Sequence, residues 1–207
     1  MSAPIRASIA DMQQHTQPLC NPVPWLADLI AGIDRVMKVA SAHAVAVRVE
    51  QAIRSVIFGE PATPAAWRAF DTWRPSRREI YRSSAHGYQI VALTLAPGQA
   101  SFAHDLGSTW AVYAPLEGAM EVTEFVVAKR KGAMTSMRTK DLHIWRRKET
   151  GTILRPLDIH ATRNPSEHEP VVALAVYGRA LDQVNIYAPH SKTTYRRQRA
   201  GLGTACA

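Results

Sequence analysis

The chain has 207 residues, of which 46% are hydrophobic and 20% are charged. This composition indicates an ordered globular protein and excludes a disordered or collagen-like chain. The length suits a single domain with a sizeable core, because all-β barrels often reach this size undivided. No apolar run approaches a membrane span, and the N-terminus lacks the charged-then-apolar layout of a signal peptide, so we expect a cytoplasmic protein.

Basic residues outnumber acidic residues, with 25 Lys and Arg against 17 Asp and Glu. They are scattered, with small clusters at 129–131, 146–148 and 196–197, and no recognisable nucleic-acid-binding module accompanies them. We therefore expect a solvated basic face, and neither a nucleic-acid nor a membrane partner. The two cysteines, Cys20 and Cys206, have no zinc-site or redox spacing and are expected to be free thiols.

The first third of the chain is predicted to be helical. Apolar residues recur at three- and four-residue spacings over 24–37 and again over 43–57, which is typical of helices that bury one face. Thr63 followed by Pro64 is a helix-start signal, because the hydroxyl can cap and proline suits the first helical position. A third, short helix is expected after it.

From Tyr81 onward the chain changes to β-branched and aromatic runs separated by Pro and Gly. Short strands with regular turn signals predict an antiparallel barrel or sandwich. The sequence predicts an exposed hairpin loop over residues 129–140. It also predicts that the basic segment after His190 is a loosely held tail. We predict one domain over 1–207, with a helical part at about 20–75, a barrel at about 78–190 and a flexible basic tail at 191–207.

The most informative segment reads GQASFAHDLGSTWAVYAPLEG, from Gly98 to Gly118. Side chains at i and i+2 on a β-strand share a face, so a His-x-His pair directs two imidazoles at one metal ion. This chain has His104 and Leu106 at those positions. An isobutyl group cannot donate a lone pair to a cation, so one metal ligand is lost.

Three separated motifs occur at matching spacings: His104-Asp105-Leu106, PLDIH at 156–160 and VALAVYGR at 172–179. Together with the segments 73–75 and 79–82, they resemble the cysteine dioxygenase family of the cupin superfamily, in particular its bacterial small-thiol dioxygenases. The resemblance spans roughly residues 70–190. It implies a mainly β fold, a cupin double-stranded β-helix (jelly-roll) barrel with a helical N-terminal segment. It also implies Fe(II) held by three histidines, and the addition of O2 to a small thiol such as cysteine or 3-mercaptopropionate to form its sulfinate.

The resemblance carries two metal ligands over to this chain. His104 matches the first iron ligand and His160 matches the third, while Leu106 stands in the place of the second. The candidate for the arginine that binds the substrate carboxylate is Arg82, one residue before the family's usual position, which is Ser83 here.

An outer Ser-x-His-x-Tyr run of the family maps onto residues 173–177, where only Tyr177, the candidate catalytic residue, is retained. Ala173 and Ala175 replace the polar pair. With Leu106 they are predicted to line a more apolar ligand pocket, because none of the three side chains ligates or hydrogen-bonds.

Two functions therefore stay open. The first is an iron-dependent thiol dioxygenase in which His104 and His160 hold Fe(II) weakly, with water or substrate in the third place and O2 as the second substrate. The second is a cupin that has lost its metal and binds a small anionic or apolar ligand in the same cavity. The retained histidines favour the first function, and the apolar replacements favour the second.

Overall fold

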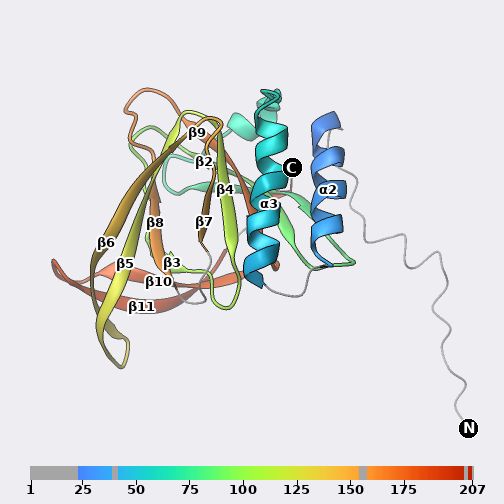
Figure 1. The fold of residues 1–207 in the computed structure, drawn as a ribbon. Coiled ribbons are helices and arrows are strands. Elements are labelled where there is room, and N and C mark those ends of the chain that lie inside the picture. The colour runs from blue at the N-terminus through green and yellow to red at the C-terminus, as the bar shows by residue number, and fades with distance from the viewer. Residues whose placement is uncertain (1–22, 39–41, 154–157, 203–204, 207) are drawn as a thin grey trace, which may run out of the picture.

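The computed structural model describes residues 23–38, 42–153, 158–202 and 205–206. Two helices lie side by side against a body built from two β-sheets (Figure 1). Among the described residues, no helix is both long enough and apolar enough to cross a membrane.

Both long helices form where the apolar spacing predicted them. Helix α2 spans Pro24–Val36 and begins with proline at its first turn, where the fixed φ of that residue suits a helix. Helix α3 spans Ala42–Ile57. The expected third helix is shortened to a single 3-10 turn, η1 (Ala65–Arg68), because the backbone is extended again at Ala69.

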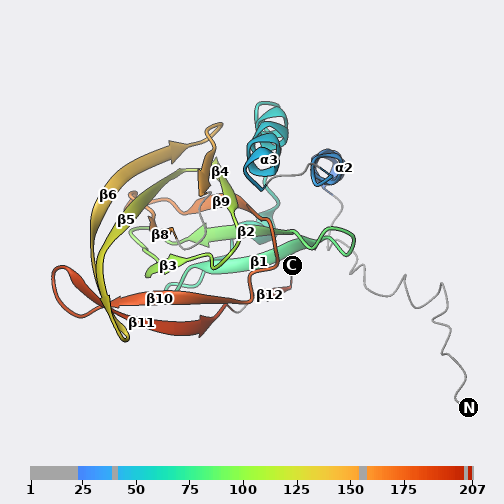
Figure 2. The ribbon, with the colours of Figure 1, turned by 60° about the horizontal axis from the view of Figure 1, so that its bottom comes forward.

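The first sheet has six strands in the order β12-β1-β2-β9-β4-β7. Its two central strands are buried along their whole length, since the helices cover one face and the second sheet covers the other (Figure 2). Strands covered on both faces are mostly apolar instead of alternating, although β2 also buries Gln89 and Thr94. The bounds are β12 (Ala205–Cys206), β1 (Ser76–Arg82), β2 (Gln89–Leu95), β9 (Val171–Tyr177), β4 (Ala111–Glu117) and β7 (Gly151–Ile153).

The second sheet closes on itself in the order β10-β11-β6-β5-β8-β3. Strand β3 joins its ends by pairing with β10 on one side and β8 on the other. The bounds are β10 (Gln183–Pro189), β11 (Thr194–Gly201), β6 (Met134–Arg146), β5 (Ala119–Lys131), β8 (Ile159–Arg163) and β3 (Ala103–Asp105). Two layered sheets of this kind, antiparallel except for the short edge strand β12, are the jelly-roll barrel that the sequence predicted, with the helical segment before it.

Two segments differ from their prediction. Most of 129–140 is strand, because β5 and β6 meet through a tight turn at Gly132, whose φ of 58° suits glycine. Residues 194–201 form β11, paired with both β10 and β6, so the flexible tail predicted from residue 191 is wrong there. Strand pairing uses backbone groups, so a basic, weakly apolar segment can still complete a barrel. Cys20 lies outside the described residues, and only the backbone of Cys206 is described.

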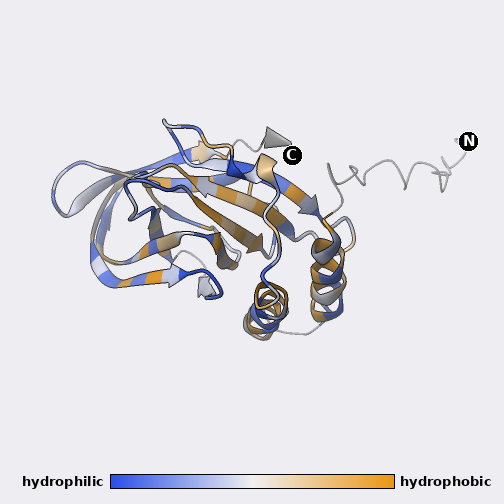
Figure 3. Cartoon of the chain, turned by 90° about the horizontal axis from the view of Figure 1, so that it is seen from above, coloured by the Kyte–Doolittle hydropathy of each residue, from blue (hydrophilic) through white to orange (hydrophobic). Residues whose placement is uncertain are grey.

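Apolar side chains gather in the spaces between the layers (Figure 3). One cluster joins α2 and α3 to the outer face of the first sheet. A second cluster fills the space between the two sheets and adjoins the predicted site.

Candidate functional site

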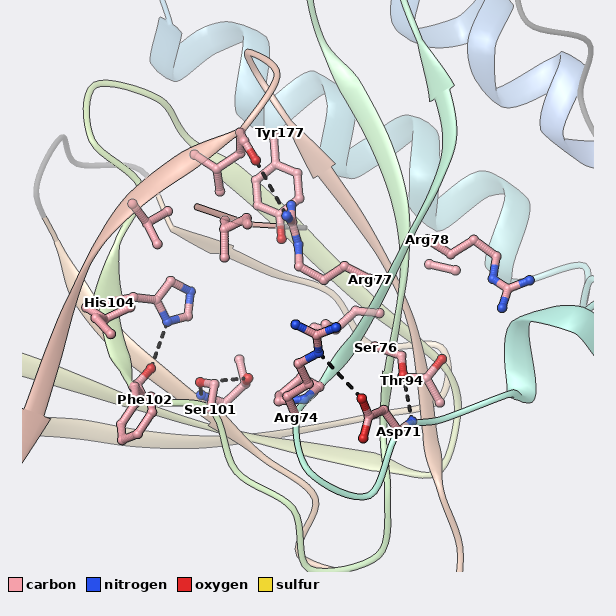
Figure 4. Close-up of a pocket in the computed structure, with 18 of the residues that line it drawn as sticks. Asp71, Arg74, Ser76, Arg77, Arg78, Thr94, Ser101, Phe102, His104 and Tyr177 are labelled. Carbon is pink, nitrogen blue, oxygen red and sulfur yellow. Dashed lines mark hydrogen bonds and ion pairs between the residues drawn. The ribbon is translucent and has the colours of Figure 1, made fainter. Parts of the chain in front are cut away.

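The structure brings the two predicted metal ligands together. Strands β3 and β8 are antiparallel, and His104 pairs directly with His160 across them. The ring centroids are 4.4 Å apart. His160 is fully buried, whereas His104 is half-buried and faces the cavity (Figure 4).

Both imidazoles are neutral. Burial lowers the pKa of His104, and burial followed by the neighbouring His104 ring holds the pKa of His160 well below its usual range. Nδ1 of His104 lies 2.9 Å from the carbonyl oxygen of Phe102, which only accepts hydrogen bonds, so Nδ1 carries the proton and the lone pair is on Nε2. A neutral ring with one available lone pair is the form that binds metal ions.

The three apolar residues that were predicted to contact the ligand lie deeper than expected. Leu106 is 2% exposed, and Ala173 and Ala175 are fully buried. All three pack in the apolar cluster between the sheets and are not part of the described cavity wall. They shape the core beneath the cavity and do not form its surface.

Tyr113 on strand β4 was not predicted, yet it lies at the centre of the site. Its hydroxyl is hydrogen-bonded to Nε2 of His160 at 3.1 Å. Its neighbours across the two adjoining strand pairs are Ala175 and Gly151. Burial, and then the nearby Tyr177, raise the pKa of Tyr113 well above its usual value. The only sequence signal was that positions 111 and 113 share the inward face of a strand.

A cavity of about 580 Å³ opens beside His104 between the two sheets. This volume falls in the range of small-molecule pockets. Tyr177, the predicted catalytic residue, lies in its wall (Figure 4). Apolar side chains from both sheets and the C-terminal segment supply much of the rest: Leu93, Leu181, Val184, Ile186 and Leu202.

Three arginines line the cavity, Arg74, Arg77 and Arg78, and Arg77 on β1 lies next to Tyr177. Its guanidinium carbon lies 5.3 Å from the centroid of the Tyr177 ring, and Nη1 donates to the carbonyl of Leu181 at 3.4 Å (Figure 4). Nη2 is buried and has no hydrogen-bond partner among the described residues. The same charge contributes to the lowered pKa of His104, which places it on the histidine side of the cavity.

Arg82, the predicted carboxylate-binding residue, does not line this cavity. Its side chain is 42% exposed and forms ion pairs with Glu79 at 2.7 Å and with Asp182 at 3.2 Å. These two carboxylates hold the guanidinium at the surface. The structure therefore moves the candidate anion-binding role from Arg82 to Arg77.

Asp105 positions the first histidine. It is fully buried between His104 and Leu106, and it faces away from the cavity. Its carboxylate accepts hydrogen bonds from the hydroxyl of Tyr187 at 2.9 Å and from the amide of Asn185. This network ties the short strand β3 to β10, so the backbone that carries His104 is fixed from behind.

The residues present do not fit the three-histidine iron centre of the resembled family. Two imidazoles are in place, and the third position is the buried Leu106. Within the described part of the chain, no three His, Cys, Asp or Glu side chains converge as a metal site would require. Nε2 of His160 is also hydrogen-bonded to the hydroxyl of Tyr113.

The chain matches the cysteine dioxygenase type I family over residues 17–190. Among solved structures, the protein TT1209 from Thermus thermophilus is similar at 19% identity over 56% of this chain and 94% of that chain, with a TM-score of 0.42. A cupin superfamily protein from Desulfitobacterium hafniense DCB-2 is similar at 14% identity over 56% and 87%, with a TM-score of 0.41. An oxalate oxidase in complex with the substrate analogue glycolate is similar at 15% identity over 57% and 59%, with a TM-score of 0.42.

No curated protein matches the chain. The family match covers most of its length and includes every motif from which the resemblance was read. On this evidence the chain belongs to the cysteine dioxygenase type I family of cupins.

Proposed function

We propose that the barrel cavity binds a small carboxylate-bearing molecule, and that Arg77 anchors its carboxylate. The observation that carries the proposal is the buried Nη2 of Arg77, which has no hydrogen-bond partner among the described residues. A buried donor without a partner costs free energy, and a carboxylate can accept two parallel hydrogen bonds from one guanidinium. A bound anion would remove that cost.

The surroundings of Arg77 set the character of the ligand. The apolar wall around Leu181 and Val184 suits a hydrocarbon body. His104 and Tyr177 also line the cavity, and both match functional positions of the family. Nε2 of His104 and the hydroxyl of Tyr177 are therefore the polar groups that we expect to face the ligand's thiol. A short thiol acid of the kind used by the family, such as 3-mercaptopropionate, meets these requirements.

The proposal is tested by titrating metal-free protein with 3-mercaptopropionate and measuring heat of binding. A charge-assisted hydrogen bond contributes about 1.5–3 kcal/mol, so Arg77→Met should weaken binding by about tenfold or more. Arg82→Met is the matched control, because it removes the same charge from a surface ion pair, and it should leave the affinity unchanged.

1-Propanethiol, which lacks the carboxylate, should bind at least about tenfold more weakly than the acid for the same reason. Equal affinity of the two compounds, or equal affinity of the native protein and Arg77→Met, would rule out Arg77 as the anchor.

A second function, oxidation of the bound thiol by O2 to its sulfinate, is favoured by the directly paired neutral imidazoles of His104 and His160. The overall reaction balances, since one thiol and one O2 give one sulfinic acid. Oxygen uptake with cysteine and with 3-mercaptopropionate, after incubation with Fe(II), tests it. Absence of sulfinate in the product mixture by mass spectrometry would leave binding as the function.

A further inference from the structure

The cavity between the two sheets is much larger than a three-carbon acid needs. An apolar cavity of about 150 Å³ is filled by benzene, which has six non-hydrogen atoms. A three-carbon thiol acid such as 3-mercaptopropionate has the same number of non-hydrogen atoms, whereas the cavity beside His104 has a volume of about 580 Å³. Such an acid would satisfy Arg77 and leave most of the space to water.

Apolar side chains lie next to both polar groups of the cavity. Residues paired directly across neighbouring antiparallel strands share a face. Leu93 on β2 is the direct partner of Arg77, and Ile186 on β10 is the direct partner of His104. All four residues line the cavity. A ligand whose carboxylate reaches Arg77 therefore meets hydrocarbon walls on both sheets.

The charged groups decide which end of the cavity holds the carboxylate. Figure 4 shows Tyr177 at one end and Arg74 with Asp71 at the other, while Arg77 lies between them. The Arg74 side chain is 81% exposed and already forms an ion pair with Asp71 at 3.4 Å. Arg78 points away from the other labelled side chains (Figure 4). The buried Arg77 is therefore the anchor, and the Arg74 end leads to solvent.

Exposed aromatic side chains gather around that open end. Among the described residues four Phe and Trp side chains are exposed, and three of these belong to the rim segments 69–75 and 101–102: Phe70, Trp73 and Phe102. Phe102 lines the cavity and is 57% exposed (Figure 4). Apolar groups left exposed beside a pocket are typical of ligand contact. The apolar wall of the cavity thus continues onto its rim.

Hydrogen bonds hold this rim in place. The backbone N–H of Asp71 donates to Oγ of Ser76 at 2.8 Å, and Nε2 of Gln99 donates to the carbonyl of Asp71 at 2.8 Å. The backbone N–H of Trp73 donates to the carboxylate of Asp71, also at 2.8 Å. Because segment 69–75 is already fixed, a ligand that reaches it does not have to order a loop.

We propose that the cavity takes a carboxylic acid with an apolar body of about eight to twelve carbons and binds it more tightly than a three-carbon acid. Half of the cavity volume corresponds to about twelve non-hydrogen atoms at the packing of benzene in its cavity. The carboxylate binds Arg77, and the apolar body extends towards Phe102. This inference rests on the proposed function for its carboxylate anchor, and it adds the size of the ligand and a residue that selects for it.

The experiment measures dissociation constants of butanoate, hexanoate and octanoate for the full chain by NMR chemical-shift titration. A fully buried methylene raises affinity about fourfold, and one that gains half of that free energy about twofold. Octanoate has four more methylenes than butanoate, so it should bind at least about tenfold more tightly, with one acid per chain. Phe102→Ala should weaken octanoate binding about fivefold, the effect of returning roughly 40 Å² of apolar surface to water, and leave butanoate binding unchanged.

Phe58→Ala is the matched control, because Phe58 is 63% exposed and does not line the cavity, and it should change neither affinity. Arg77→Met should weaken both acids by the same factor and keep their ratio. Equal affinities of butanoate and octanoate for native protein, or equal effects of the two Phe variants on octanoate, would overturn the inference and leave the anchor standing. No effect of Arg77→Met on either acid would instead overturn the anchor. Unfolding midpoints of all variants separate loss of binding from loss of the fold.

Discussion

The orientation of the Tyr113 ring depends on a residue with no side chain. Trp145 lies across strand β7, where a Cβ placed on Gly151 would overlap the indole ring. The indole in turn stacks on Tyr113 and on His143. Gly151 therefore acts on the site through Trp145, whose indole stacks on the phenol ring.

We predict that this single substitution, Gly151→Ala, lowers the free energy of unfolding by about 1–3 kcal/mol, the usual cost of overpacking a core. Urea denaturation followed by tryptophan fluorescence measures it. Gly201→Ala is the control, since a Cβ there meets no atom within 4 Å and should leave the midpoint unchanged. Equal midpoints for the two variants would show that Trp145 moves aside at no cost.

Sequence alone could find only part of this site. His104 and Leu106 are two residues apart on a strand, so their shared face follows from local geometry. Arg77 and Tyr113 lie 27 and 9 residues from His104 in sequence, and no local rule links them to it. They reach the histidines only because β1 and β4 belong to the sheet that faces β3.

At the level of elements, helix α2 packs on the barrel through a narrow row of apolar side chains. Leu26, Leu29 and Ile33 are almost fully buried against the outer face of the first sheet. A hydrogen bond also joins the helix to the sheet: the hydroxyl of Tyr88 donates to the carboxylate of Asp34 at 2.9 Å. The helix is thus part of the folded core, as its apolar spacing predicted.

We expect Ile33→Ala to lower the free energy of unfolding by about 2–5 kcal/mol, because it leaves a cavity under the helix as well as losing apolar contact. Arg35→Ala, on the exposed side of the same helix, should change it little. Thermal or urea unfolding of both proteins checks the difference. If Ile33→Ala were as stable as Arg35→Ala, α2 would not contribute to the cooperative unit.

Across the whole molecule, the positive charge is concentrated at one place. The segments 129–140 and 190–201 contain nine of the 25 Lys and Arg and none of the 17 Asp and Glu. The rest of the chain therefore has 16 basic and 17 acidic residues. The two segments meet, since Arg196 pairs with Met134 and the backbone of Arg197 donates to Ala133 at 2.7 Å. They lie on the side of the barrel away from the helices (Figure 2).

Charges that lie within about one Debye length, roughly 8–10 Å at moderate salt, act on a surface together. We therefore predict that replacing Arg196 and Arg197 by Glu lowers the salt needed for elution from a cation exchanger more than replacing Arg35 and Arg48 by Glu. All four side chains are exposed, and both pairs change the net charge equally. Identical shifts would mean that only total charge, and not its placement, governs retention.

The sequence by itself determined the fold class, the two helices and the family, because each of these depends on motifs and spacing along the chain. The resemblance to that family singled out His104 and His160 together. It also determined that position 106 offers no ligand. Only the tertiary structure decided that Arg77 and not Arg82 lines the cavity, and that the hydroxyl of Tyr113 is hydrogen-bonded to His160. It also joined two separate basic segments into one surface. These outcomes depend on which strands become neighbours, and neighbours distant in sequence are set by the closure of the barrel and not by local pattern.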